Sequence, residues 1–316
     1  MQRLTLERRQ VWVYLAGIML GLLAGSLWPG IGHFSEWLLW PALMLLLFAT
    51  FVQVPLLHLR EAFADHRFVL AVLLGNFVLL PLLVWGLLPW LPGDPALRLG
   101  VMLVLLVPCT DWFITFSQLG GGNVPRAIAV TPLNLLLQLL LLPLYLWLMG
   151  DAQLTTTLGL ADVWPALLVV VLPLLLALPS QRWIEARAER ERVRDHLAWW
   201  PVPLLGLVLL LIATAQVGAA RSALALLPVL LPLFAGFLLL AALLARALAL
   251  LLGLPREQGR TLAFSMGTRN SFVMLPFAVA LPAGWELVAL VIVVQSLVEL
   301  FGMLLYLWVL PRYLFR

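Results

Sequence analysis

The sequence predicts an all-α polytopic membrane protein, and three observations support this fold class. Of its 316 residues, 64% are hydrophobic and only 11% are charged, with a mean hydropathy of +1.07. A soluble domain has about 45–50% apolar and about 25% charged residues. Apolar runs of the length that an α-helix needs to cross a bilayer recur along the chain. All the basic residues are arginines, and most of them lie between these runs, which indicates membrane topology rather than nucleic-acid binding.

Ten apolar runs, bounded by proline, glycine or charged residues, are predicted to span the membrane. They comprise residues 11–28, 37–57, 68–90, 97–119, 127–149, 163–180, 199–219, 227–252, 262–281 and 286–310. With the N-terminus in the cytoplasm, 15 of the 19 arginines face the cytoplasm and only Arg98 and Arg221 lie in outside connectors. This asymmetry predicts a protein of the cell (inner) membrane with both termini cytoplasmic. The polar stretch Gln181–His196 is expected to be a solvated cytoplasmic helix between spans six and seven.

Spans five and ten contain an internal repeat with an offset of 161 residues. The matching polar and aromatic positions are Asn134 with Gln295, Gln138 with Glu299, Tyr145 with Tyr306 and Trp147 with Trp308. In the predicted topology these two spans run in opposite directions. The sequence therefore predicts two inverted five-helix repeats, residues 1–150 and 151–316, an arrangement found in many secondary transporters.

Spans four and nine are expected to be interrupted at matching positions. Pro108 lies near the middle of span four, where it removes a backbone donor and disturbs the preceding turn. With the same offset, its neighbour Cys109 corresponds to Asn270, inside the run Gly267–Ser271, whose residues form helices poorly. Unwound backbone at this depth must be buried in protein or line a wet cavity, and it indicates the binding site of a transporter.

Three ionisable residues, Asp111, Arg269 and Glu299, lie deep within the predicted spans. Such groups are costly in a membrane and indicate a function. Asp111 and Arg269 are expected to form an ion pair between the two breaks, either at the binding site or only to hold the two helices together. Glu299 follows Gln295 by one helical turn. Together with Asn134 and Gln138 they are predicted to face the breaks, the alternative being hydrogen bonding between packed helices.

Cys109 is the one cysteine of the chain. A lone cysteine in an apolar helix is usually a small buried hydrophobic residue. Its place directly after the helix-breaking Pro108 and close to Asp111 favours a functional role. A thiolate is a soft ligand, so Cys109 is predicted to be a transient ligand for a soft metal or metalloid.

The motifs VPCTDWFITFSQLGGGN, TRNSF and QSLVEL resemble the bile acid:sodium symporter superfamily, and within it the arsenical-resistance (arsenite efflux) permeases. The resemblance implies a panel domain of spans one, two, six and seven, and a core domain in which spans four and nine cross near the substrate. It also implies that Cys109 and Glu299 are required. Pro108 replaces the basic residue common in those permeases, and Arg269 replaces one of a pair of asparagines. A positive charge at Arg269 argues against bound sodium.

Two functions follow from these observations. The first is export of arsenite or antimonite, proton-coupled or driven by the membrane potential, with Cys109 as ligand, Glu299 as proton carrier, and Asn270 and Gln295 orienting hydroxyl groups. The second is a sodium- or proton-coupled carrier of organic anions such as bile acids, held by Arg269. The chain has no HExxH motif and its histidines lie in connectors or at span ends, so an enzyme is not expected. No cofactor or nucleic-acid partner is expected. The expected partners are a small inorganic or organic solute, the lipid bilayer and H⁺.

Overall fold

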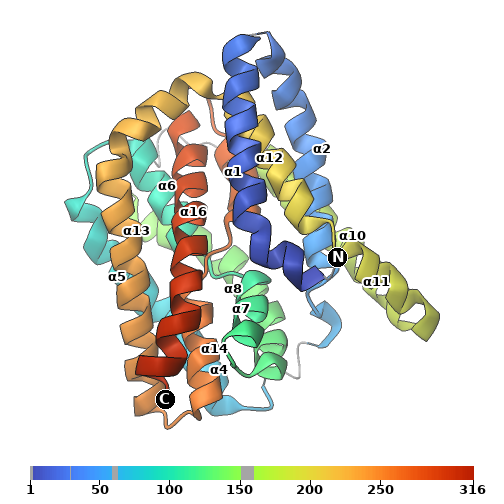
Figure 1. The fold of residues 1–316 in the computed structure, drawn as a ribbon, viewed down its shortest axis with the longest axis vertical. Coiled ribbons are helices and arrows are strands. Elements are labelled where there is room, and N and C mark those ends of the chain that lie inside the picture. Colours follow the sequence, from blue (N-terminus) through green and yellow to red (C-terminus); the bar gives the residue numbers. More distant parts are fainter. Residues whose placement is uncertain (1–2, 29, 59–62, 151–159) are drawn as a thin grey trace. The chain divides into compact units, whose positions relative to one another are not determined.

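The structure is a computed structural model that describes residues 3–28, 30–58, 63–150 and 160–316, and this part of the chain is almost entirely helical (Figure 1). It divides into two compact units. Unit 1 comprises Met1–Gln53, Leu158–Leu226 and Phe272–Val293, and unit 2 comprises Val54–Thr157, Leu227–Ser271 and Val294–Arg316. Each unit therefore takes segments from both predicted repeats. Unit 1 contains predicted spans one, two, six and seven, the set that the resemblance assigns to a panel domain.

Unit 1 is built on helices that pack around α12. Its helices are α1 (Arg3–Leu27), α2 (Ile31–Phe51), α10 (Leu160–Glu185), η4 (Ala188–Arg190), α11 (Glu191–Leu197), α12 (Pro201–Ala215), the first part of α13 (Val217–Leu251), most of α15 (Ser271–Val279) and the first part of α16 (Glu286–Val309). Helix α12 contacts both α1 and α2, and α2 contacts α10 (Figure 1).

Three glycines set the close approach of α1 to α12. A Cβ atom at Gly17, Gly21 or Gly25 would lie within 2.6 Å of a backbone oxygen of α12. The spacing of four residues places the three glycines on one face of α1, as in other helix pairs that pack through small residues in membranes. At these three positions the backbones of the two helices therefore approach each other directly.

Unit 2 contains the predicted site residues. Its helices are η1 (Leu56–His58), α4 (His66–Leu74), the π-helical turn η2 (Gly75–Leu79), α5 (Leu80–Leu87), η3 (Leu88–Trp90), α6 (Pro95–Leu105), α7 (Trp112–Leu119), α8 (Val124–Met149), the rest of α13, α14 (Arg256–Gly267), the rest of α16 and η5 (Leu310–Leu314).

The predicted interruptions of spans four and nine are confirmed. Helix α6 ends at Leu105 and α7 begins at Trp112, while α14 ends at Gly267 and α15 begins at Ser271. The two interruptions meet in an isolated antiparallel bridge between Pro108 and Arg269. Two backbone hydrogen bonds close this bridge: Cys109 N–H to Thr268 O at 3.2 Å and Asn270 N–H to Val107 O at 2.9 Å. The unwound backbone thus satisfies part of its hydrogen bonding internally, as an apolar environment requires.

Three boundary predictions were wrong. Helix α2 covers Ile31–Phe51 rather than 37–57. It ends four residues before Pro55, whose ring would clash with the carbonyl of Phe51 in a continued helix, although the helix does contain Pro41. Helix α13 begins at Val217 rather than at residue 227, so the helix already includes Arg221; the alanine- and leucine-rich run around it has high helix propensity. The stretch Gln181–His196 is not one helix, since α10 ends at Glu185 and α11 begins at Glu191.

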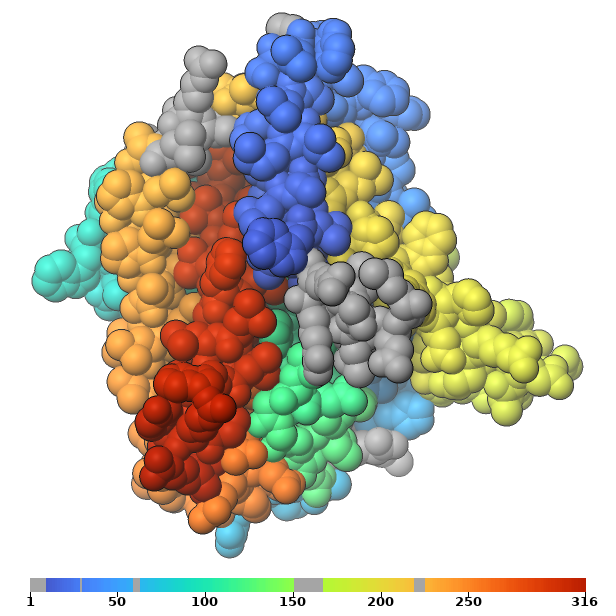
Figure 2. All heavy atoms as spheres, viewed as in Figure 1, coloured from blue at the N-terminus to red at the C-terminus, as the bar shows by residue number. Residues whose placement is uncertain are grey.

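Eight helical segments of the described chain are long and apolar enough to cross a membrane. Large apolar side chains are also exposed along α13 and α16, two helices whose surfaces Figure 2 shows in orange and red. They include Leu239, Leu250, Phe301 and Leu305, each more than half exposed. Exposed apolar surface on this scale is expected where lipid is the solvent.

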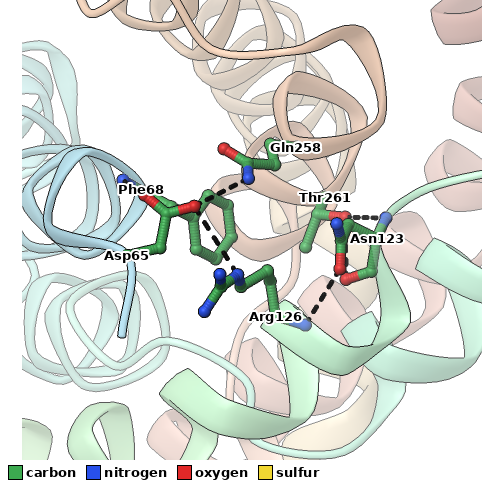
Figure 3. Close-up of polar contacts among 6 residues, drawn as sticks. All are labelled: Asp65, Phe68, Asn123, Arg126, Gln258 and Thr261. Atoms are coloured by element: carbon green, nitrogen blue, oxygen red, sulfur yellow. Dashed lines mark hydrogen bonds and ion pairs between the residues drawn. The ribbon is translucent and has the colours of Figure 1, made fainter. Parts of the chain in front are cut away.

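A polar cluster joins α14 to the beginnings of α4 and α8 within unit 2 (Figure 3). Asp65 caps α4, and its second carboxylate oxygen accepts a hydrogen bond from Gln258 Nε2 at 2.8 Å and lies 3.5 Å from Arg126 Nε. Asn123 caps α8, and its N–H donates to Thr261 Oγ1 at 2.7 Å. Partial burial acts to raise the pKa of Asp65, but its hydrogen bonds and the charge of Arg126 outweigh this, so the pKa is lowered from its ordinary value.

Candidate functional site

All the predicted site residues lie in unit 2, which also contains the bridge between the two interrupted helices. Seven of them are at most 2% exposed: Cys109, Asn134, Gln138, Arg269, Asn270, Gln295 and Glu299. Asp111 is partly buried. So many polar and charged side chains in the interior of an apolar helical unit are costly unless they pair or bind something.

On the α16 side, the polar groups form a continuous hydrogen-bonded network. Glu299 Oε2 accepts from the backbone N–H of Arg269 at 2.7 Å and from Gln295 Nε2 at 2.8 Å. Gln295 Oε1 in turn accepts from Ser271 Oγ at 3.3 Å, and Ser271 Oγ accepts from Ser296 Oγ at 2.8 Å. Glu299 and Gln295 therefore hold the interruption between α14 and α15.

On the α8 side, the polar groups are mostly left unpaired. Asn270 Nδ2 lies 3.2 Å from Thr110 Oγ1 and 3.5 Å from Gln138 Oε1, a long contact. Within the part of the chain that the structure describes, both amide atoms of Asn134 and the Nε2 of Gln138 have no hydrogen-bond partner. A buried polar group without a partner costs about 1–3 kcal/mol. These amides therefore have spare capacity for a polar ligand.

Cys109 lies in the interruption between α6 and α7, with its thiol directed to Asp111. The Sγ of Cys109 donates to Asp111 Oδ1 at 3.0 Å, and the same oxygen accepts the N–H of Trp112 at 2.8 Å. Asp111 is thus the N-cap of α7, where the helix dipole favours a negative charge. Among the described residues, no group of three or more His, Cys, Asp and Glu side chains gathers as a metal site.

The ion pair expected between Asp111 and Arg269 is not formed, and this prediction was wrong. The guanidinium of Arg269 instead binds oxygen atoms at the C-terminal ends of α6 and α14. Its Nη2 lies 2.9 Å from Asn76 Oδ1, 2.9 Å from Ser265 O and 2.8 Å from Met266 O, and its Nη1 lies 3.3 Å from Leu105 O. Helix C-termini carry partial negative charge and unpaired carbonyls, so they compete successfully with a carboxylate that already caps a helix.

Two residues of this arrangement were not predicted from the sequence. Asn76 lies in the π-helical turn η2, and its Nδ2 donates to Ser265 Oγ at 3.0 Å while its oxygen accepts from Arg269. A fully buried asparagine within an otherwise apolar span was the available signal. Ser265 contributes mainly through its backbone oxygen, which sequence patterns do not reveal.

Several contacts in unit 2 recur at the offset of the sequence repeat. The two hydrogen bonds of the bridge are equivalent under this offset. The donors Cys109 and Asn270 are 161 residues apart, and so are the acceptors Val107 and Thr268. Tyr145 donates to Phe77 O at 2.7 Å, and at the same offset Tyr306 donates to Leu238 O. At the bridge and at the two tyrosines, residues that match in sequence therefore make matching contacts.

Bilayer-length helices around a buried polar centre define the class as an integral membrane protein. The sequence matches the sodium bile acid symporter family over residues 40–220, more than half of the chain, and the protein belongs to this family of membrane solute transporters.

Two curated relatives are similar to this chain. An uncharacterized protein of Pseudomonas aeruginosa is 33% identical over 129 residues, which cover 40% of this chain and 39% of that protein. The P3 protein of Mus musculus is 27% identical over 303 residues, which cover 85% of this chain and 61% of that protein. The chain thus spans less than two thirds of the length of either relative.

Proposed function

We propose that this chain is a secondary transporter, not an enzyme, that exports arsenite or antimonite by alternating access. The observations that carry the proposal are three buried amide atoms on α8 without a hydrogen-bond partner among the described residues, both of Asn134 and the Nε2 of Gln138, and the buried thiol of Cys109. Gln138 also contacts Asn270, whose backbone N–H closes the bridge together with that of Cys109. A buried thiol and unpartnered amides in the same unit suit a small, uncharged solute with hydroxyl groups.

The proposed architecture has ten spans in two inverted repeats, residues 1–150 and 151–316, with both termini in the cytoplasm. Eight long helices and two interrupted pairs, α6 with α7 and α14 with α15, make up the ten. The contacts that recur at an offset of 161 residues support the repeat. Interrupted helices at matching positions are the usual place of a substrate site in such transporters.

The proposed chemistry at Cys109 is a reversible exchange of ligands on the metalloid. Arsenite at neutral pH is mostly As(OH)₃. The S–H bond and one As–OH bond break, an S–As bond forms, and the proton and hydroxide leave together as water, with no change in oxidation state. Asp111, which accepts the hydrogen bond of the thiol, is placed to receive the proton in transit. One thiol ligand gives an exchangeable site, as release requires.

The remaining hydroxyl groups bind the amides of Asn134 and Gln138, while Glu299 is proposed to carry the coupling proton. Its Oε2 is already engaged by two N–H groups, and its Oε1 has no partner within the described chain. Proton coupling or the membrane potential then drives export.

The test is uptake of arsenite and antimonite into everted membrane vesicles with an imposed proton gradient. We expect the wild-type chain to accumulate both, and Cys109→Ser to lose at least about tenfold of the rate, the effect of about 1.4 kcal/mol of lost binding. The matched control is the double variant that adds Ser117→Cys to Cys109→Ser. It restores a thiol on neighbouring α7 but not at the bridge, and uptake should stay as low as in Cys109→Ser. Full uptake by Cys109→Ser would refute the proposed chemistry.

Membership in the sodium bile acid symporter family favours a second candidate, a carrier of organic anions coupled to sodium or protons. Because the guanidinium of Arg269 is engaged by backbone oxygens, the carboxylate would bind to Asn134 and Gln138 instead. Taurocholate uptake in the same vesicles that persists in Cys109→Ala would favour this function over arsenite export.

A further inference from the structure

We propose that the guanidinium of Arg269 is a resident cation that takes the place of a sodium ion at the bridge, so that transport by this chain does not require sodium. The inference rests on the proposed transport function for its first test, but not for its second. The family name implies a sodium partner, but the positive charge of Arg269 already occupies the oxygen atoms at the bridge.

The oxygen atoms around Arg269 are those that would suit a sodium ion. Unwound backbone carbonyls and the C-terminal ends of half-helices coordinate Na⁺ in transporters with interrupted helices. Here the carbonyls of Leu105, Ser265 and Met266 and the amide oxygen of Asn76 all meet the guanidinium within 3.3 Å. The side chain is 2% exposed, so the positive charge is buried among these oxygens.

The guanidinium also lies between positions that match in the internal repeat. Leu105 and Met266, whose carbonyls it contacts, are 161 residues apart. Asn76 accepts a hydrogen bond from it, and the matching residue Phe237 presents its ring to it at 5.6 Å. One cation therefore serves the negative C-terminal ends of both half-helices. The residue that matches Arg269 itself is Pro108, which supplies no charge.

A guanidinium differs from sodium in one respect that matters for coupling. It stays charged and cannot leave, because it is covalently attached and is not deprotonated in proteins. It can therefore stabilise the two helix ends as an ion would, but it cannot carry the energy of a sodium gradient. The energy for transport then comes from another source, such as the proton bound at Glu299.

The first test measures uptake in vesicles in which sodium is replaced by choline at equal ionic strength. We expect the rate of the wild-type chain to change less than about twofold, the precision of such a comparison, equivalent to about 0.4 kcal/mol. A strict requirement for sodium would overturn the inference.

The second test does not depend on which solute is carried. We expect the unfolding temperature of the purified wild-type protein to be the same in sodium, guanidinium and choline chlorides at equal, low ionic strength. Arg269→Ala should unfold at a lower temperature in choline and recover by about 5 °C in sodium or guanidinium, since a ligand that binds the folded state stabilises it. Sodium-dependent stabilisation of the wild-type protein would overturn the inference, whether or not the variant folds.

The matched control is Arg260→Ala in α14, the helix that precedes the interruption at Arg269. Arg260 also binds backbone oxygens, those of Gly121 and Phe315, but away from the bridge. Its removal should produce no dependence on sodium. Arg269→Gln, which keeps two donors without the charge, replaces Arg269→Ala if the latter does not fold. A folded variant that neither cation stabilises also overturns the inference.

Discussion

Helices α8 and α16 carry polar side chains at matching positions, but they use them differently. On α16, Glu299 accepts hydrogen bonds from Gln295 and from the unwound backbone at Arg269. On α8, Asn134 has no partner among the described residues and Gln138 has only a long contact with Asn270. The same sequence position thus holds the fold together in one half and remains available for a ligand in the other.

The physical reason for this difference lies in the matching residues Pro108 and Arg269. Arg269 has a backbone N–H, which donates to Glu299. Pro108 has no backbone N–H, so Gln138, which matches Glu299, has no equivalent N–H from which to accept a hydrogen bond. One proline therefore releases α8 from the structural role that α16 performs.

The largest expected effect is that of Glu299→Ala on stability. The substitution leaves the N–H of Arg269 and the amide of Gln295 without their acceptor, which should lower the free energy of unfolding by about 2–5 kcal/mol. Thermal or denaturant unfolding of the purified protein measures this. Glu286→Ala, in the first turn of the same helix, where the carboxylate accepts the N–H of Gly284, is the control and should cost about 1 kcal/mol or less. If Glu299→Ala were as stable as the wild type, α16 would not have the structural role assigned to it.

The opposite result is expected for the two amides on α8. Replacing Asn134 with Leu, or Gln138 with Met, removes polar atoms that pay a burial cost without a partner, so stability should stay the same or rise by about 1 kcal/mol. Transport should fall by about tenfold or more, because the ligand loses its hydrogen bonds. Unfolding and uptake are measured on the same preparations. Variants that lose stability but keep transport would assign α8 the structural role instead.

The matched tyrosines should behave alike, in contrast to the matched amides. Tyr145→Phe and Tyr306→Phe each remove one buried hydrogen bond to a backbone oxygen. Each should lower the free energy of unfolding by about 1 kcal/mol and leave transport largely unchanged. A difference between the two variants of more than about 1 kcal/mol would show that the halves differ beyond the bridge.

The smallest effect is expected at Asp65, which lies in the polar cluster of α4, α8 and α14. Because its pKa is lowered in the folded protein, its contribution to stability is present above its ordinary value of 3.8 and is lost as the pH falls through the folded value. The free energy of unfolding of the wild type should fall with pH in this range, and that of Asp65→Asn should fall less. The difference should be less than about 1 kcal/mol, because the pair of Asp65 with Arg126 is partly exposed. If the wild type and Asp65→Asn lost stability equally as the pH falls, the ionised Asp65 would not be the group responsible.

Much of the candidate site could be predicted from the sequence because its signals are local. Pro108 and the run Gly267–Ser271 break helices wherever they occur in an apolar segment, and the structure confirms both interruptions. Polar residues such as Asn134 and Glu299 are conspicuous because so few others lie deep in the spans. The predicted helix boundaries were wrong where the signal was weak, as at the beginning of α13, where alanine and leucine extend the helix ten residues before position 227.

The sequence alone determined that this protein lies in a membrane, where its helices break and which polar residues lie at depth, since hydropathy and helix propensity depend on the residues themselves. Only the tertiary structure decided how those residues pair. Arg269 binds the carbonyls of two helix ends rather than Asp111, and Asn76 joins them, because these partners come from segments distant in sequence. Hydrogen-bond partners depend on which segments meet in space, and residue type does not record that.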